Sequence, residues 1–133
     1  MYLVDTSVFT RVVRTPVSEA MERLAPLGLR HSHLTGLELR FSASTEAEWD
    51  LFEAAVSEYE RVPVLPQDLD RADVVQRALA GRGLKGRKPI DLIIAAQAER
   101  LRLTVVHYDK DFEFIASITD QSHEWIVPRG TID

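Results

Sequence analysis

The sequence contains no cysteine among its 133 residues. Disulfide bonds and thiolate chemistry are therefore excluded, whatever the protein does. A chain without disulfides suits a reducing compartment, and we expect a cytoplasmic protein.

Long apolar segments are also missing. No apolar run approaches the roughly 20 residues that a membrane-spanning helix needs. The N-terminus lacks a basic region followed by an apolar stretch, so no signal peptide is expected. Repeats, low-complexity tracts and linkers are absent as well. The length predicts a single domain covering residues 1–133.

An overall basic excess, which is common in nucleic-acid-binding proteins, is lacking too, because the net charge is −5. The basic residues are nevertheless unevenly distributed. Arg82, Lys85, Arg87 and Lys88 lie within seven residues that contain no acid, directly before a predicted helix. Such a local positive segment suits a polyanionic substrate, so we predict that these four residues bind substrate.

Short apolar runs predict five strands, and longer periodic segments between them predict helices. The expected strands are residues 2–4, Leu29–Leu34, Val62–Leu65, Thr104–His107 and Glu124–Val127. Their alternation with helices predicts an α/β fold with a mainly parallel five-stranded sheet covered on both faces. The second strand fits least well, because its polar residues are poor ones for a buried parallel strand. A proline in the third strand indicates an edge or end position.

Caps and apolar periodicity place the helices. We expect helices over Val8–Val13, from Pro16 to about residue 27, around Glu38 with Thr35 as its cap, after a cap at Ser44 or Thr45, over Pro66–Ala80, over Pro89–Leu101, and around Phe112. In the helix after Thr45, the apolar residues Trp49, Phe52, Val56 and Tyr59 are spaced by three, four and three. That spacing predicts a stripe that faces the core.

Four carboxylates lie near strand ends or helix starts, namely Asp5, Glu38, Asp91 and Asp109. In an open α/β sheet these places converge on one crevice beyond the carboxyl ends of the strands. Each pair of charges would repel by about 4 kcal/mol at 4 Å with an effective dielectric of 20. Divalent cations would neutralise such a cluster, and Asp111 adds a further acid beside it.

Each acid also has an ordinary explanation when it is taken alone. Asp5 and Asp109 are plausible helix caps, and Asp91 would complement a helix dipole. Glu38 lies between two leucines, as a surface residue of an amphipathic helix often does. The joint pattern favours a metal site more strongly than any member does, because Asp91 begins a nearly uncharged helix where a carboxylate has little structural purpose.

The ordered set of motifs resembles a PIN domain, and most closely the VapC toxins of toxin–antitoxin pairs. The resemblance spans essentially the whole chain and rests on Asp5-Thr6-Ser7, Thr35-x-x-Glu38-Leu39, Ile90-Asp91-x-x-Ile94-Ala95-Ala96 and His107-Tyr108-Asp109-Lys110-Asp111-Phe112. It implies a three-layer α/β/α sandwich and an endoribonuclease that depends on Mg²⁺ or Mn²⁺. It also implies a VapB-like antitoxin partner and a homodimer.

The resemblance assigns roles to individual residues. The catalytic acids would be Asp5, Glu38, Asp91 and Asp109, with Asp111 joining the metal ligands. Thr6 or Ser7 would bind a phosphate oxygen or a ligand carboxylate. Hydrolysis of RNA would then leave 5′-phosphate and 3′-hydroxyl ends. The polar strand Leu29–Leu34 departs from the family pattern and leaves the placement of Glu38 open.

Other polar residues are less specific. His31 and His33 would share a strand face, and we interpret them as edge-strand residues rather than a metal pair. His107 is expected to be structural rather than a general acid. Arg11, Arg14 and Arg40 suit contacts to RNA backbone and solvated helix faces equally well.

Three other functions remain for comparison. A receiver-like signalling module would need an adjacent acid pair after the first strand, and Asp5 stands alone there. A DNA-directed phosphodiesterase would use the same acids, and only the resemblance favours RNA over DNA. A catalytically silent binding module would need a geometric defect in the site.

Overall fold

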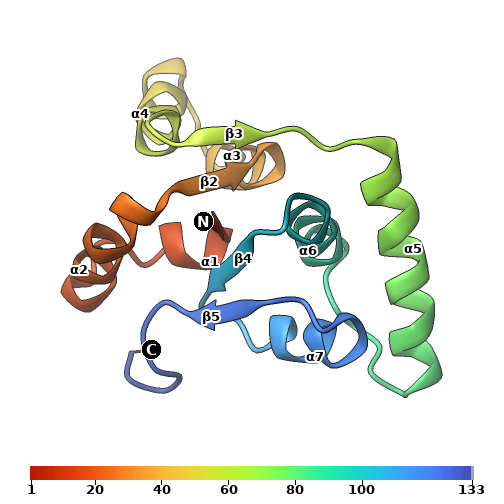
Figure 1. The fold of residues 1–133 in the computed structure, drawn as a ribbon. Coiled ribbons are helices and arrows are strands. Elements are labelled where there is room, and N and C mark those ends of the chain that lie inside the picture. The colour runs from red at the N-terminus through yellow and green to blue at the C-terminus, as the bar shows by residue number, and fades with distance from the viewer. Residues whose placement is uncertain (133) are drawn as a thin grey trace.

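The computed structural model describes residues 1–132 and contains one sheet of five parallel strands (Figure 1). The strands are β1 (Tyr2–Val4), β2 (Leu29–Ser32), β3 (Glu60–Val62), β4 (Thr104–His107) and β5 (His123–Trp125). Their order is β3-β2-β1-β4-β5, and each neighbouring pair is parallel. The predicted five-stranded parallel sheet is therefore confirmed, and all five carboxyl ends lie along one edge.

Helices cover both faces of the sheet. They are α1 (Thr6–Phe9), α2 (Thr15–Leu24), the 3₁₀ turn η1 (Ala25–Leu27), α3 (His33–Arg40), α4 (Glu46–Ser57), α5 (Pro66–Gly81), α6 (Pro89–Leu101) and α7 (Asp111–Thr119). Leu3 of β1 packs in a core with α5, α6 and α7, whereas the next residue, Val4, packs with α1 and α2. Side chains alternate along a strand, so the two cores lie on opposite faces and make three layers. None of the helices in the described part of the chain is both long and apolar enough to cross a membrane.

The second strand was predicted too long and in the wrong place within the sheet. β2 ends at Ser32, whose side chain accepts a hydrogen bond from Leu34 N at 3.1 Å and so caps α3 in place of Thr35. β2 also lies between β3 and β1, so His31 is a buried residue of an interior strand and not of an edge. His33 begins α3, so the two histidines do not share a strand face.

Three other boundaries shift. α1 ends at Phe9, and the predicted helix over Val8–Val13 continues only as turns. β3 covers Glu60–Val62 and stops before Pro63, although its predicted edge position is correct. β5 begins at His123 and ends at Trp125, slightly earlier than predicted, because it pairs in register with β4. The pattern within one strand does not show which residues of the neighbouring strand will pair with it.

The apolar stripe on α4 is mostly at the surface, so the prediction that it faces the core is wrong. Val56 is fully buried, but Trp49 and Phe52 are 44% and 36% exposed. Leu51, outside that stripe, is 72% exposed. Thr45 does cap the helix, since its hydroxyl accepts a hydrogen bond from Glu48 N. α4 therefore presents apolar surface to the outside of the molecule.

Helix α6 matches its predicted bounds and is the element that delivers an acid to the sheet edge. Pro89 at its first position supplies a backbone angle already suited to a helix. Ile94, Ala95 and Ala98 pack in the core below β4, and this packing fixes the rotation of the helix. Asp91 in the first turn is consequently buried at the carboxyl ends of β1 and β4.

Candidate active site

Asp5 follows β1 directly and lies at the centre of the sheet edge. It is 2% exposed, and Asp5 N donates to Val106 O of the neighbouring strand. Its Oδ2 accepts hydrogen bonds from Ser7 N at 3.0 Å and Ser7 Oγ at 2.6 Å, which is the geometry of a helix cap. Its Oδ1 is buried and has no hydrogen-bond partner among the described residues. Capping thus explains only one of the two oxygens.

Asp91, Asp109 and Asp111 gather beside Asp5. One carboxylate oxygen from each of the three lies within 4.8 Å of the others. Asp91 Oδ2 is buried without a hydrogen-bond partner among the described residues. Asp109 Oδ1 accepts from Asp111 N at 2.9 Å, which turns the chain so that both side chains face α6. The tertiary structure therefore brings these predicted acids together.

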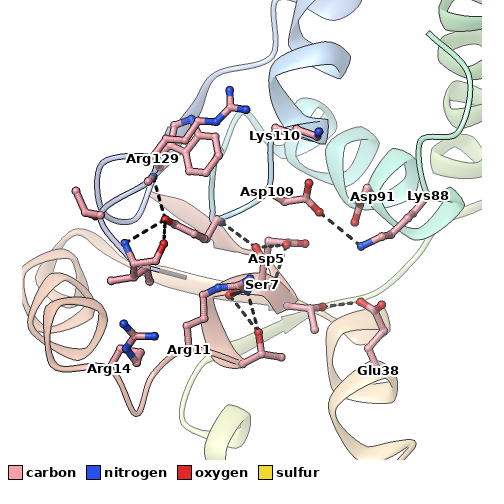
Figure 2. A pocket seen from close by; sticks show the side chains of 17 residues that line it. Asp5, Ser7, Arg11, Arg14, Glu38, Lys88, Asp91, Asp109, Lys110 and Arg129 are labelled. Atoms are coloured by element: carbon pink, nitrogen blue, oxygen red, sulfur yellow. Dashed lines mark hydrogen bonds and ion pairs between the residues drawn. The ribbon is translucent and has the colours of Figure 1, made fainter.

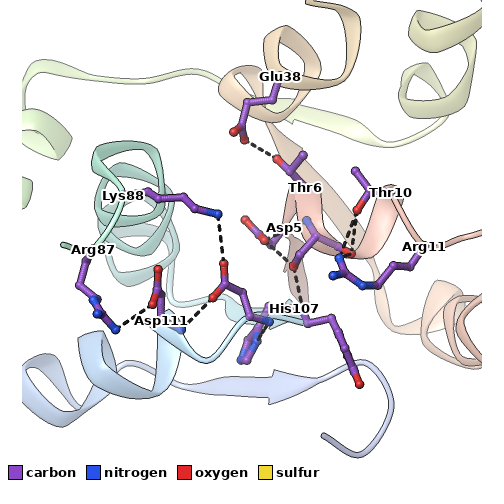
Figure 3. A network of polar contacts seen from close by, with 12 residues as sticks. Asp5, Thr6, Thr10, Arg11, Glu38, Arg87, Lys88, His107 and Asp111 are labelled. Atoms are coloured by element: carbon purple, nitrogen blue, oxygen red, sulfur yellow. Dashed lines mark hydrogen bonds and ion pairs between the residues drawn. The ribbon is translucent and has the colours of Figure 1, made fainter. Parts of the chain in front are cut away.

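Glu38 approaches the cavity from α3 on the other side of Asp5 (Figures 2 and 3). The Thr6 hydroxyl donates to Glu38 Oε1 at 2.6 Å and lies 3.1 Å from the hydroxyl oxygen of Thr35. Ser7 is likewise engaged with Asp5, and its hydroxyl also accepts from Tyr108 N at 2.8 Å. Both hydroxyls thus contact acids of the site, and the partner of Ser7 is Asp5, a predicted metal ligand.

Burial strongly disfavours the charged forms of the two central acids. Burial, and then the charges of Asp5 and Asp109, raise the pKa of Asp91 to about 8. Burial is also the main cause that raises the pKa of Asp5 to about 6, although the hydrogen bonds from Ser7 act in the opposite direction. A proton or a cation must therefore compensate this cluster at neutral pH.

The donor set fits a hard divalent cation. All the candidate ligands are carboxylate oxygens, which Mg²⁺ and Mn²⁺ prefer. Asp5 and Asp91, which each have a buried oxygen without a hydrogen-bond partner among the described residues, line the same cavity as Asp109. A buried unpaired carboxylate oxygen is costly, and metal coordination removes that cost.

Two of the four predicted substrate-binding cations contact the acids directly. Lys88 Nζ lies 3.7 Å from Asp109 Oδ2, and Arg87 Nη1 donates to Asp111 Oδ1 at 2.8 Å (Figure 3). Burial alone would lower the pKa of Lys88, but the surrounding carboxylates, Asp91 foremost, raise it. Only Lys88 among the four lines the acidic cavity.

Lys85 and Arg82, the other two predicted cations, form no ion pair with these acids among the described residues. Arg87 and Lys85 line a separate small cavity, and Arg82 donates to Ser117 O at 3.2 Å. The guanidinium of Arg87 also stacks over Phe114, with 4.5 Å between its central carbon and the ring centroid. These residues therefore do not form a single row beside the acids, and their contacts to substrate stay a prediction.

The opposite end of the acidic cavity is basic and aromatic. The cavity has a volume of about 970 Å³, near the top of the roughly 300–1,000 Å³ range of small-molecule sites. Its other lining residues are Thr10, Arg11, Arg14, Tyr108, Lys110, Trp125, Arg129, Gly130, Thr131 and Ile132 (Figure 2). Trp125 was predicted only as part of the fifth strand and Arg129 was given no role, although an aromatic and a basic residue in one short segment were a visible signal.

Two polar residues have structural roles. His107 is fully buried, and burial, followed by the charge of His123, lowers its pKa to about 3. Its Nδ1 accepts from Asp109 N at 3.1 Å, so Nε2 of the neutral ring donates to His123 Nδ1 at 2.9 Å. Arg40 is buried, paired with Glu53 and stacked on Trp49, so it is neither a solvated residue nor exposed for RNA.

Comparisons with known proteins agree with this geometry. Residues 2–117 match the PIN domain family model. The chain is 44% identical to Ribonuclease VapC51 of Mycobacterium tuberculosis over 99% of this chain and 97% of that protein. It is 38% identical to Ribonuclease VapC18 of the same organism over 99% of both chains.

Solved structures show the same fold. VapBC-1 from nontypeable Haemophilus influenzae superposes with a TM-score of 0.78 at 21% identity, covering 94% of this chain and 97% of that one. VapBC-5 from M. tuberculosis, described as a member of a toxin–antitoxin family, gives a TM-score of 0.64 at 26% identity over 92% and 94%. The fold, the family match and the full-length relatives place this chain in the PIN domain family, among the VapC ribonucleases.

Proposed function

We propose that this protein is an endoribonuclease toxin that needs Mg²⁺ or Mn²⁺ and hydrolyses RNA phosphodiester bonds to 5′-phosphate and 3′-hydroxyl ends. The observation that carries this proposal is that Asp5 and Asp91, which line one cavity with Asp109, each have a buried carboxylate oxygen without a hydrogen-bond partner among the described residues. Relatives named ribonucleases support RNA as the substrate.

Each acid has a distinct role in this proposal. Asp5, Asp91 and Asp109 would hold the cation, with Asp111 available for a second ion. The bound cation would supply Lewis-acid activation of water and charge stabilisation at the departing oxygen. Glu38, oriented by Thr6, would position and deprotonate the attacking water. Ser7 keeps the Asp5 carboxylate in its orientation.

The scissile phosphate would dock between the acids and the first turn of α6. Lys88 offers an exposed ammonium at this point, with 67% of its side chain accessible. The free N–H groups at the start of α6 add favourable potential for an anion. Lys85, Arg82 and Arg87 would guide the strand toward the site from farther away.

The direct test incubates total RNA with purified toxin, with and without Mg²⁺ or Mn²⁺, beside Asp91→Asn. We expect discrete cuts that need the metal, disappear in the variant and carry 5′-phosphate ends. Asp50→Asn on exposed α4 is the control and should cut like wild type. Cleavage by Asp91→Asn at the wild-type rate would refute the mechanism. Cleavage of DNA but not RNA would refute the substrate, and metal binding without any cleavage would indicate a silent binding module.

An antitoxin is the proposed protein partner, since the similar VapBC-5 structure belongs to a toxin–antitoxin family. A second cavity of about 1140 Å³ lies between α1, α2, α3 and α4 and is lined by apolar side chains such as Phe9, Met21, Phe41 and Phe52. Acids also line it, including Glu22 and Glu58, which favours a partner segment with basic residues.

Thr10 and Glu38 line both this groove and the acidic cavity. A partner segment in the groove therefore needs to pass only these two residues to reach the acids. Phe41 and Phe52 line this groove, and their exposed fractions are 86% and 36%. They therefore offer apolar surface to a partner. We infer that the antitoxin's C-terminal segment lies here and directs a basic side chain toward the acids.

Copurification with the product of the adjacent gene tests this partner. Phe41→Ala and Phe52→Ala should each weaken the complex at least tenfold and leave cleavage by free toxin unchanged. Val74→Ala on α5 is a matched control, because this valine is 58% exposed but lies outside the groove. Equal antitoxin binding by all three variants would contradict the proposed binding groove.

We further propose that residues 1–133 act as one domain and that the protein forms a homodimer in the cytoplasm. Light scattering would detect the dimer.

A further inference from the structure

We propose that Arg129 and Trp125, held together by Glu113, form a platform on which an unpaired RNA base stacks next to the cleaved bond. The proposal rests on the ribonuclease function and adds a nucleotide-binding subsite outside the acids. This platform comes from β5, α7 and the segment that follows β5, none of which contributes to the predicted substrate-binding set.

The charge of the cavity changes from one end to the other. The carboxylates occupy the end near α6, whereas Arg129 lies on the opposite side of the cavity (Figure 2). Lys110, the residue after Asp109, places a further cation beside the acids. RNA that is cut at the acids carries further phosphates on both sides, and cations are required where that strand continues.

Glu113 joins the two members of the platform. Trp125 Nε1 donates to Glu113 Oε1 at 2.9 Å, and Arg129 Nη1 lies 3.4 Å from Glu113 Oε2. The central guanidinium carbon of Arg129 is 5.6 Å from the Trp125 ring centroid. The Arg129 side chain is nevertheless 57% exposed. A planar cation is therefore held in place while most of it remains open to a ligand.

The underlying structure is rigid. The Trp125 ring meets Tyr108 edge-on at 5.2 Å and lies 5.0 Å from the buried ring of His107. The Tyr108 hydroxyl accepts from Gly130 N at 3.0 Å and donates to Ile132 O at 2.7 Å. The segment that carries Arg129 is thus fixed on both sides, and ordering it on binding would cost little entropy.

This chemistry matches an unpaired nucleotide better than it matches a simple anion. A surface phosphate site needs only mobile cations, but this cation is aligned with an indole ring. Guanidinium planes and indoles stack on bases that are not already paired or stacked in a helix. The subsite would therefore favour cleavage in loops and single strands, at a phosphate near the base that stacks on the platform.

Tryptophan fluorescence tests the platform directly, because the chain has only two tryptophans. The Trp49→Phe variant leaves Trp125 as the sole reporter, and adding Asp91→Asn prevents cleavage during the titration. A short unstructured RNA should quench Trp125 with saturation, while an equally long RNA duplex should quench it far less. Absence of quenching at concentrations that saturate binding would overturn the proposal, as would equal quenching by the duplex.

The second test measures the kinetics of RNA cleavage by variants that keep all the catalytic acids. Arg129→Ala should raise KM at least tenfold with kcat changed less than twofold, and Arg129→Lys should restore only part of the loss. Arg77→Ala, an exposed arginine of α5 outside both cavities, should behave like wild type. An unchanged KM in Arg129→Ala together with a lower melting temperature would show that Arg129 only stabilises the C-terminal segment. That result would overturn a role in RNA binding. Wild type that cuts no RNA would overturn the ribonuclease itself, whereas cutting with unchanged Trp125 fluorescence overturns the platform alone.

Discussion

Asp91→Asn should stabilise the metal-free protein, and by an amount that depends on pH. Asparagine has nearly the shape of aspartate but carries no charge. Burial, and then the charge of Asp5, raise the pKa of Asp91 from the ordinary 3.8 to about 8 in the folded protein. The residue is only 5% exposed, so solvent screens this effect little.

The sign follows from proton linkage. A folded-state pKa above the unfolded value contributes stability that is fully present below pH 3.8 and is lost as the pH rises through about 8. That difference corresponds to roughly 6 kcal/mol at about 1.36 kcal/mol per pH unit. Because Asp5 and Asp91 influence each other's charge, we expect the advantage of Asp91→Asn to grow by about 3–6 kcal/mol between pH 4 and pH 9.

Urea unfolding in the presence of a chelator at pH 4, 6, 8 and 9 measures this difference for wild type and variant. The Asp50→Asn control, exposed on α4, should differ from wild type by one small amount at every pH. Saturating Mg²⁺ should stabilise wild type at pH 8, by about 2.7 kcal/mol at 100 times the Kd, and should leave Asp91→Asn almost unchanged. A constant difference between wild type and Asp91→Asn across this pH range would refute the electrostatic argument.

Other predictions concern the neighbouring cations and the core. Arg87→Ala removes the partner of Asp111 and should tighten Mg²⁺ binding severalfold in calorimetry; weaker binding would contradict competition between arginine and metal. Ile94→Ala should cost about 2–5 kcal/mol of unfolding free energy, whereas Leu51→Ala on the surface should cost less than about 0.5 kcal/mol. Tyr108→Phe should cost about 1–3 kcal/mol, because buried main-chain groups lose their partner; chemical denaturation measures all three stabilities, and an unaffected Tyr108→Phe would contradict that role.

Much of the sheet was predictable because its strands are short apolar runs bounded by clear breaks. β1 and β4 appear at their predicted bounds, and so does α6 with Pro89 at its start. The end of β2 was predicted wrongly although its signal is local, since Ser32 accepts its capping hydrogen bond from Leu34 N. Ser32 ends β2 and caps α3, and the polar strand tolerates burial because it pairs with β1 and β3 on both sides.

The apolar stripe on α4 shows a further limit of prediction from sequence. Its spacing predicts an apolar face, and such a face exists, but periodicity does not reveal what covers it. Trp49 and Phe52 stay partly exposed because α4 packs mainly on α3 and places only Val56 of the stripe in the core. An apolar face can serve a partner as well as a core.

The sequence by itself determined the element order, the parallel α/β class and the acids that would meet, because strand ends and helix starts are local features. Only the tertiary structure decided which oxygens lack partners, that Arg87 pairs with Asp111, and that Trp125 and Arg129 line the same cavity as the acids. Those facts depend on strand order and helix rotation. Packing of residues far apart in the chain sets both, and no local pattern encodes them.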